Sequence, residues 1–164
     1  MIRSAGLLIF RKRGVNVEVL LCHPGGPFWA KKDTWSIPKG EVAEDESLEQ
    51  ALEREFVEET SFDIPQGERI NLGEAKQSSS KTNYVWAVEG DMDTSKFACR
   101  STFEMEWPPK SGKKQEFPEN DRVAWFELSQ AKQKVFKAQQ VFIDRLSERL
   151  NITQSDAPFQ QSLL

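Results

Sequence analysis

The sequence predicts a single α/β domain, and three observations support that fold class. The chain has 164 residues, which is enough for one substantial core and short for two ordinary domains. Apolar residues make up 38% and charged residues 29%, a mixture typical of soluble globular proteins. Segments with the apolar pattern of strands occur together with segments that have the pattern of helices. We therefore expect one domain over residues 1–150 and a C-terminal tail over 151–164.

The first elements follow from apolar runs and turn residues. Residues 4–11 and 15–22 are apolar and β-branched and flank Arg13 and Gly14, so they are expected to form a hairpin or two strands of the sheet. Residues 35–40 are expected to form a short extended segment that ends in a glycine turn. Both features place strands at the start of the domain.

A helix is predicted over residues 47–60, because apolar residues recur there at intervals of three and four. Asp45 or Ser47 can cap its start, and Ser47 with Gln50 has the spacing of a capping box. The same reasoning gives the later elements. Strands are predicted at 70–76, 81–89 and 122–128, an irregular loop at 95–119, and a helix at 137–150.

Charge and composition exclude several classes of protein. The net charge of −4 argues against binding to a nucleic-acid duplex, so a ligand with phosphates would need a cation to mediate its binding. No run approaches the roughly 18 apolar residues that span a bilayer. Residues 1–10 lack the features of a secretory signal, so we expect a cytoplasmic protein with no membrane partner. Cys22 and Cys99 have no CxxC spacing, which predicts reduced thiols.

Three glutamates of the predicted helix lie on its apolar side, which is formed by Leu48, Ala51, Leu52 and Phe56. At about 100° per residue, Glu55, Glu58 and Glu59 fall within about 100° of arc beside that stripe. Like charges at this spacing repel one another, and the last turn of a helix disfavours anions. A sequence that breaks these rules at one place indicates a function there.

An oxygen-rich cluster of this kind favours a hard divalent cation such as Mg²⁺ or Mn²⁺. Zinc prefers histidine or cysteine ligands, and the single histidine, His23, cannot supply such a site. The alternative is an acidic helix that pairs with Arg54 and nearby lysines, since Arg54 stands four residues before Glu58. The motif around these residues favours the metal site.

Residues 40–62 read GEVAEDESLEQALEREFVEETSF. This segment resembles the Nudix box, which is Gly, five residues, Glu, seven residues, Arg-Glu, an apolar residue, any residue, Glu-Glu, any residue, Gly and an apolar residue. The matching positions are Gly40, Glu46, Arg54, Glu55, Phe56, Glu58, Glu59 and Phe62. Ser61 stands where the family has a glycine. That glycine takes a left-handed conformation that closes the helix, and serine there costs on the order of 1 kcal/mol.

The resemblance implies the family's α/β/α sandwich, in which a mixed β-sheet is flanked by helices. It implies hydrolysis of a pyrophosphate bond in a nucleoside diphosphate-X substrate with Mg²⁺ or Mn²⁺ as cofactor. Glu55, Glu58 and Glu59 would hold the cations together with the main-chain carbonyl of Gly40. Arg54 would orient these glutamates by ion pairing.

The family also implies roles outside the three glutamates. Glu46 would brace the loop before the helix. Family members often add a carboxylate six residues ahead of a tryptophan, and Glu119 stands six residues before Trp125, with Glu116 as the alternative. The general base would be Glu55 or a loop residue, and we favour Glu55.

The substrate class is suggested by residues 35–40, which are similar to the Trp-x-x-Pro-Lys-Gly segment of diadenosine tetraphosphate hydrolases and diphosphoinositol polyphosphate phosphohydrolases. Lys39 can contact a phosphate, and Lys81 resembles a phosphate-binding lysine of the dinucleoside polyphosphate group. Tyr84 is expected to bind substrate by stacking on a base. Other candidates for a stacking wall are His23, Phe28 and Trp29.

A dinucleoside polyphosphate is therefore the favoured substrate, a small-molecule nucleotide bound by a monomer or a homodimer. The alternatives are a pyrophosphohydrolase of nucleoside triphosphates or nucleoside diphosphate sugars, and a catalytically idle nucleotide-binding module on the same fold, suggested by Ser61. Residues 102–114, with several lysines and Trp107, suit either a lid over a polyphosphate or an exposed basic loop.

Overall fold

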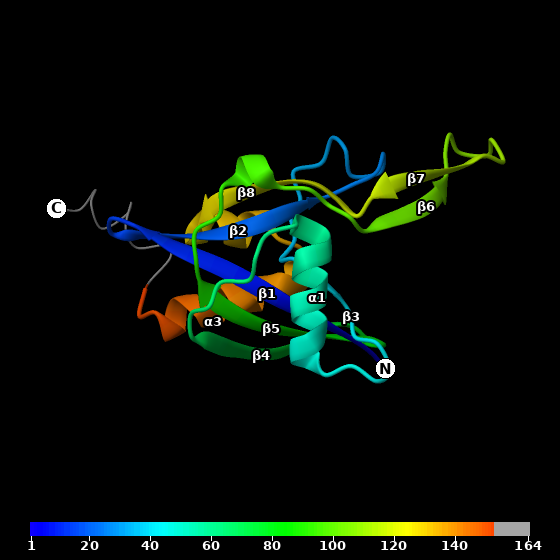
Figure 1. Ribbon diagram of the computed structural model, residues 1–164. Coiled ribbons are helices and arrows are strands. Elements are labelled where there is room, and N and C mark those ends of the chain that lie inside the picture. Colours follow the sequence, from blue (N-terminus) through cyan, green and yellow to red (C-terminus); the bar gives the residue numbers. More distant parts are fainter. Residues whose placement is uncertain (153–164) are drawn as a thin grey trace.

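The computed structural model describes residues 1–152 of the chain (Figure 1). Its strands are β1 (Ile2–Arg13), β2 (Asn16–Pro24), β3 (Lys39–Glu41), β4 (Arg69–Ser78), β5 (Lys81–Glu89), β6 (Thr102–Glu106), β7 (Lys114–Pro118) and β8 (Asn120–Glu127). Its helices are α1 (Leu48–Thr60), α2 (Leu128–Lys134) and α3 (Gln140–Arg149), with short 3-10 turns η1 (Thr94–Lys96) and η2 (Lys137–Gln139). The predicted tail over 151–164 lies outside the described residues, apart from 151 and 152.

Strand β1 is the centre of a mixed sheet. The sheet has the order β4-β5-β1-β2-β8, and β3 pairs with the N-terminal half of β1. Strand β1 runs antiparallel to β2 and β3 and parallel to β5. Strands β6 and β7 form a separate hairpin that projects from one end of the molecule (Figure 1). The mixed sheet that the resemblance implied is confirmed.

Helices cover both faces of this sheet, with α1 on one face and α3 on the other (Figure 1). Alternation along β1 places Leu7 and Ile9 in the core on the α1 face, and Leu8 and Phe10 in the core on the α3 face. A strand that is covered on both faces has a continuous apolar sequence, because no side of it meets water. This explains the unbroken apolar run near the start of the chain.

Helix α1 begins where the capping box predicted. The Ser47 hydroxyl accepts a hydrogen bond from the Gln50 backbone N–H at 3.1 Å, and the Gln50 side chain accepts one from the Ser47 backbone N–H at 2.9 Å. Ala51, Leu52 and Phe56 are fully buried against the sheet. This packing fixes the rotation of the helix and so decides where its glutamates lie.

Three predictions of local structure were wrong. Residues 95–119 are not an irregular loop, because 102–118 form the β6–β7 hairpin. Gly40 is not in a turn but lies inside β3, opposite Ala5 of β1. The short helix α2 was not predicted, since seven residues with few apolar positions give only a weak periodic signal.

Two simpler predictions concern membranes and thiols. Within residues 1–152, no helix is long and apolar enough to cross a membrane. Cys22 is buried in the sheet and Cys99 is half-buried, and both are free thiols. Burial raises the pKa of the Cys22 thiol well above its ordinary value, so Cys22 is an inert core residue.

Candidate active site

A pocket of about 400 Å³ lies where the C-terminal half of α1 meets β3 and the residues that flank the β6–β7 hairpin. All residues predicted to bind metal line this pocket, and so do both lysines predicted to contact phosphate. The lining residues are Lys39, Gly40, Glu41, Glu55, Glu58, Glu59, Lys81, Ser101 and Glu119. Segments far apart in the sequence therefore supply one acidic pocket with two lysines.

Arg54 organises the acidic side chains beside this pocket. Its guanidinium donates to both carboxylate oxygens of Glu46, at 2.8 and 2.9 Å, and to Glu55 at 2.8 Å. A longer contact of 3.3 Å joins it to Glu58. The hydrogen bonds from Arg54 lower the pKa of Glu46 to about 2, with a smaller contribution from the Ala43 backbone N–H. The predicted orienting role of Arg54 and the bracing role of Glu46 agree with these contacts.

Glu59 is the most buried acid of the pocket. It is 8% exposed, and among the described residues its Oε2 has no hydrogen-bond partner. Burial and, to a smaller extent, the nearby charge of Glu55 raise the pKa of Glu59 to about 8, although Asn120 and Lys39 oppose the shift. A buried carboxylate without a partner for one oxygen is costly unless something positive binds it.

The Glu55 carboxylate lies directly against the backbone of Gly40. A Cβ atom built at Gly40 would overlap the Glu55 carboxylate, so only glycine allows this approach. Burial raises the pKa of Glu55, while the hydrogen bond from Arg54 opposes the rise. The close approach explains why glycine occupies the middle of β3.

The two lysines give the pocket a cationic part. Burial and, to a smaller extent, the charge of Lys81 lower the pKa of Lys39 to about 8, although nearby glutamates oppose the shift. A phosphate between the two ammonium groups would offset their repulsion. This arrangement fits the predicted phosphate contacts of Lys39 and Lys81.

The segment 98–101 was missed by the sequence analysis. The backbone N–H groups of Ala98 and Arg100 donate to the carbonyls of Thr60 and Glu58, at 3.1 and 2.7 Å. These bonds satisfy two of the carbonyls that the end of α1 leaves free. The segment then delivers Ser101 to the pocket. No local pattern could reveal this contact, because its partners are about forty positions apart in the sequence.

The predicted stacking residues have different positions. Tyr84 is half-buried on β5 and does not line the pocket. His23 is fully buried, with ring nitrogens 2.9 Å from Asp121 and 2.6 Å from the Lys32 carbonyl, so it is a structural residue and cannot stack on a base. Phe28 is 58% exposed, and Trp29 packs edge-on against Phe136.

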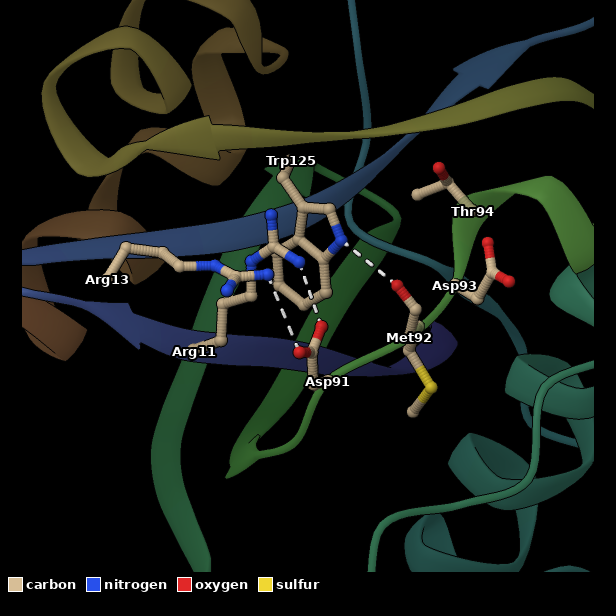
Figure 2. Close-up of a pocket in the computed structure, with 7 residues that line it drawn as sticks. All are labelled: Arg11, Arg13, Asp91, Met92, Asp93, Thr94 and Trp125. Carbon is tan, nitrogen blue, oxygen red and sulfur yellow. Dashed lines mark hydrogen bonds and ion pairs between the residues drawn. The ribbon is translucent and has the colours of Figure 1, made fainter.

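A second pocket, of about 470 Å³, lies near the C-terminal end of β1 (Figure 2). Arg11 stacks on Trp125 at 4.0 Å and pairs with Glu18 and Asp91, each at 2.8 Å. The Trp125 indole N–H donates to the Met92 carbonyl at 3.3 Å. The charges are paired within the protein, so this cluster ties the loop after β5 to β1 and β8. It shares no lining residue with the glutamate pocket.

Comparison with known protein families identifies the arrangement. The family model of the NUDIX domain matches residues 2–146. The chain belongs to the Nudix family. The matched range contains the whole of the Nudix box and every lining residue of the glutamate pocket.

Related proteins agree with the Nudix assignment. An RNA pyrophosphohydrolase from Hahella chejuensis (strain KCTC 2396) is 48% identical over 51 residues, which are 29% of this chain and 32% of that protein. The match thus spans about a third of the length of that relative. A C. elegans Ap4A hydrolase binary complex has 20% identity and a TM-score of 0.59, covering 92% of this chain and 98% of that chain.

The NUDIX domain of Shewanella oneidensis NrtR complexed with ADP ribose has 20% identity and a TM-score of 0.62, covering 92% of this chain and 88% of that chain. At such identities the solved structures show the shared Nudix fold, a mixed sheet between helices. A shared fold does not establish a shared reaction, so the reaction is inferred from the residues of the pocket.

Nudix hydrolases generally use divalent metals, and the donor set of the pocket fits such an ion. Within residues 1–152, no three His, Cys, Asp or Glu side chains are gathered closely enough to hold one ion in the conformation seen. Glu55 and Glu58 are engaged by Arg54. Among residues 1–152, however, the buried Oε2 of Glu59 has no hydrogen-bond partner, and the same pocket offers the carboxylates of Glu55, Glu58 and Glu119, whose oxygens hard cations prefer.

Proposed function

We propose that this chain is a Nudix pyrophosphohydrolase that depends on a divalent cation and cuts a pyrophosphate bond in a nucleoside diphosphate-X substrate. The observation that carries the proposal is one pocket lined by five glutamates and two lysines, among them Glu55, Glu58, Glu59, Glu119, Lys39 and Lys81. Carboxylates suit the cation, and ammonium groups suit phosphate oxygens. Neither group alone would bind and activate a pyrophosphate in a protein of net charge −4.

Each residue has a distinct role in this proposal. Glu55, Glu58, Glu59 and Glu119, with the Gly40 carbonyl, would hold Mg²⁺ or Mn²⁺. When bound, the cation supplies neutralisation of the pyrophosphate and lowers the pKa of a nearby water.

The remaining chemistry belongs to the protein. Glu55 accepts the proton of the attacking water, because its carboxylate lines the pocket beside Glu58 and Glu59. Lys39 and Lys81 bind the phosphate oxygens and stabilise charge on the leaving phosphate. Arg54 holds Glu55 and Glu58 in place by hydrogen bonds to their carboxylates.

We favour a dinucleoside polyphosphate as substrate. Lys39 directly before Gly40, together with Lys81, supports this class, and a similar fold occurs in the C. elegans Ap4A hydrolase. The Hahella relative, whose name is RNA pyrophosphohydrolase, adds RNA that carries a pyrophosphate bond as a candidate. Nucleoside triphosphates and nucleoside diphosphate sugars are the remaining alternatives.

A substrate panel tests the proposal directly. It contains dinucleoside polyphosphates, nucleoside triphosphates, nucleoside diphosphate sugars, a short 5′-triphosphorylated RNA and inorganic tripolyphosphate, each with Mg²⁺ and with Mn²⁺. We expect the highest kcat/KM for a dinucleoside polyphosphate and no turnover in the presence of a chelator. A preference for another member of the panel contradicts the substrate but keeps the reaction class.

The second candidate function is a catalytically idle nucleotide-binding module. It was suggested by Ser61, but this residue adopts the left-handed conformation that the family glycine would take, with φ of 62°, and closes the helix normally. Tight nucleotide binding without turnover of any member of the panel would favour this candidate.

A further inference from the structure

We propose that the β6–β7 hairpin is a substrate-binding arm whose inner face stacks on the nucleoside part of the substrate. The arm comprises residues 102–118. Its inner face is defined by Phe103, Met105, Trp107 and Phe117. The inference rests on the proposed function, because it assigns the part of the substrate that lies beyond the pyrophosphate.

The arm begins at the glutamate pocket itself. Ser101 and Glu119 flank the hairpin, both line the pocket, and the Glu119 backbone N–H donates to the Ser101 carbonyl at 2.9 Å. The Gly25 backbone N–H donates to the Glu119 carbonyl, also at 2.9 Å. One side of the hairpin base thus touches the end of β2, and the segment before it touches the end of α1. A rigid base of this kind fixes where the arm points.

The face of the arm that continues the pocket is apolar. Side chains alternate along a strand, so the pair Ser101 and Glu119 shares a face with Phe103 and Phe117, which lie opposite each other. The next residues on that face are Met105 opposite Gln115, and then Trp107 opposite Lys113, so the apolar side chains lie mainly on β6 and at Phe117. Same-face neighbours are about 7 Å apart along a strand, so the two phenylalanines lie one step beyond the pocket.

The phenylalanines form a fixed aromatic surface. The Phe103 and Phe117 rings are 6.0 Å apart at an angle of 40°, and both side chains are half-buried. A Cβ atom at Gly26, which has φ of 89°, would lie 2.6 Å from the Phe103 ring, so the ring packs on the bare backbone there. Aromatic rings that are held in place and partly exposed suit stacking on nucleobases.

Charge decides which face of the arm an anionic substrate uses. The outer face carries Glu104 and Glu116 directly opposite each other, both exposed, followed by Glu106 opposite Lys114, so its net charge is negative. This face would repel a polyphosphate. The inner face has no acid between Glu119 and the tip, and Lys113 lies opposite Trp107 at its far end. A nucleotide that extends from the pocket therefore follows the inner face.

Two conservative variants test the arm, Phe103→Leu and Phe117→Leu, which keep apolar bulk but remove the ring. We expect KM for the preferred nucleotide to rise about tenfold, the loss of one stacked base, while kcat changes less than about twofold. KM for inorganic tripolyphosphate, which has no base, should not change. Phe103→Tyr should behave like the parent. Glu104→Ala, on the outer face of the same strand, is the matched control and should leave both substrates unaffected.

Other outcomes overturn the inference. An equal effect on nucleotide and tripolyphosphate would mean that the variants disturb the pocket, and no effect on either would mean that the inner face does not meet substrate. A change in sedimentation mass without a change in KM would assign the face to a second copy of the chain.

A failure of the proposed function is distinguishable from a failure of the arm. If the parent hydrolyses neither nucleotides nor tripolyphosphate, the proposed function fails. The Kd of ADP is then measured by calorimetry for the parent and for Phe103→Leu. We expect weaker binding by the variant, and equal affinities would overturn the substrate-binding role of the arm.

Discussion

The glutamates of the pocket have different surroundings, and these differences set what each can do. Glu59 is buried, and one of its oxygens has no hydrogen-bond partner within residues 1–152, whereas the Glu58 side chain is 42% exposed and its contact with Arg54 is longer, at 3.3 Å. Glu55 is held between Arg54 and the backbone of Gly40. Substitutions at these positions should therefore separate effects on catalysis from effects on folding.

Replacing Glu58 by glutamine should remove activity without unfolding the protein. Glutamine keeps the shape of the side chain but not the charge that binds a cation, so Glu58→Gln should lose at least about a hundredfold in kcat. Relief of repulsion at the end of α1 offsets the loss of the Arg54 contact, each worth a few tenths of a kcal/mol. The metal-free melting temperature should be equal to that of the parent or slightly higher.

The matched control is Glu49→Gln, at an exposed acid in the first turn of the same helix. It should keep parental turnover. Near-parental activity of Glu58→Gln, or a fall of many degrees in its metal-free melting temperature, would mean that Glu58 is only an ion-pair partner.

Gly40→Ala should lower activity more than stability. The added methyl group would occupy the position of the Glu55 carboxylate, which is the flexible end of a side chain and can move aside at small cost. Glu55 would then leave its place at the pocket, and we expect a loss of at least about tenfold in kcat. Chemical denaturation and steady-state kinetics measure the two effects. A variant that loses more than about 3 kcal/mol of stability would show that Gly40 serves the fold rather than Glu55.

At the scale of elements, helix α1 is held at both ends. The capping box closes its start, and Ser61 closes its end in a left-handed conformation, with its hydroxyl donating to the Ala98 carbonyl at 2.6 Å. The hydroxyl ties the helix to the segment that carries Ser101 into the pocket. The left-handed backbone conformation of Ser61 costs some stability, but its hydroxyl forms a hydrogen bond that links two parts of the site.

Two variants of Ser61 separate these contributions. Ser61→Ala keeps the strained conformation and loses the hydrogen bond, while Ser61→Gly relieves the strain and also loses the bond. Ser61→Gly should therefore be more stable than Ser61→Ala by about 1 kcal/mol. Urea unfolding of the two variants gives the difference. Equal stabilities would mean that the left-handed conformation costs nothing here.

Some of these elements were predictable from local sequence patterns and others were not. The capping box and the rotation of α1 follow from local rules, so the position of its glutamates was predictable. The β6–β7 hairpin was missed although Phe103, Met105 and Trp107 alternate with exposed residues, because Pro108 and Pro109 suggested a loop. The buried hydrogen bonds of His23 depend on residues distant in sequence, which no local pattern reveals.

At the scale of the whole molecule, the metal-free protein should lose stability as the pH rises. The pKa of Glu59 is about 8 in the folded protein and about 4.5 in a free side chain. Between these values the folded state keeps a proton that the unfolded state has released, so stability falls by up to about 1.4 kcal/mol per pH unit. The melting temperature without metal, measured from pH 5 to pH 8, should fall more steeply for the parent than for Glu59→Gln.

Magnesium should reverse this trend. A cation at Glu59 must displace the proton, so the rise in melting temperature on adding Mg²⁺ should grow between pH 6 and pH 8. Glu59→Gln should show a smaller rise with little dependence on pH. Parallel pH profiles of parent and variant, with and without Mg²⁺, would contradict the role of Glu59 in both predictions.

The parallel pairing of β1 with β5 has a consequence for the newly made chain. Ile2 pairs with Lys81, and the pocket also needs Glu119, so its parts span most of the sequence. The chain loses the entropy of closing these large loops before the contacts between distant segments form. Folding is therefore expected to be slow relative to that of a helical protein, in which most contacts are local. During synthesis, a nascent chain that ends before Glu119 contains every residue of the Nudix box but lacks Glu119 and β8, the strand that follows it. The motif is therefore complete in the chain well before all residues of the pocket have been made.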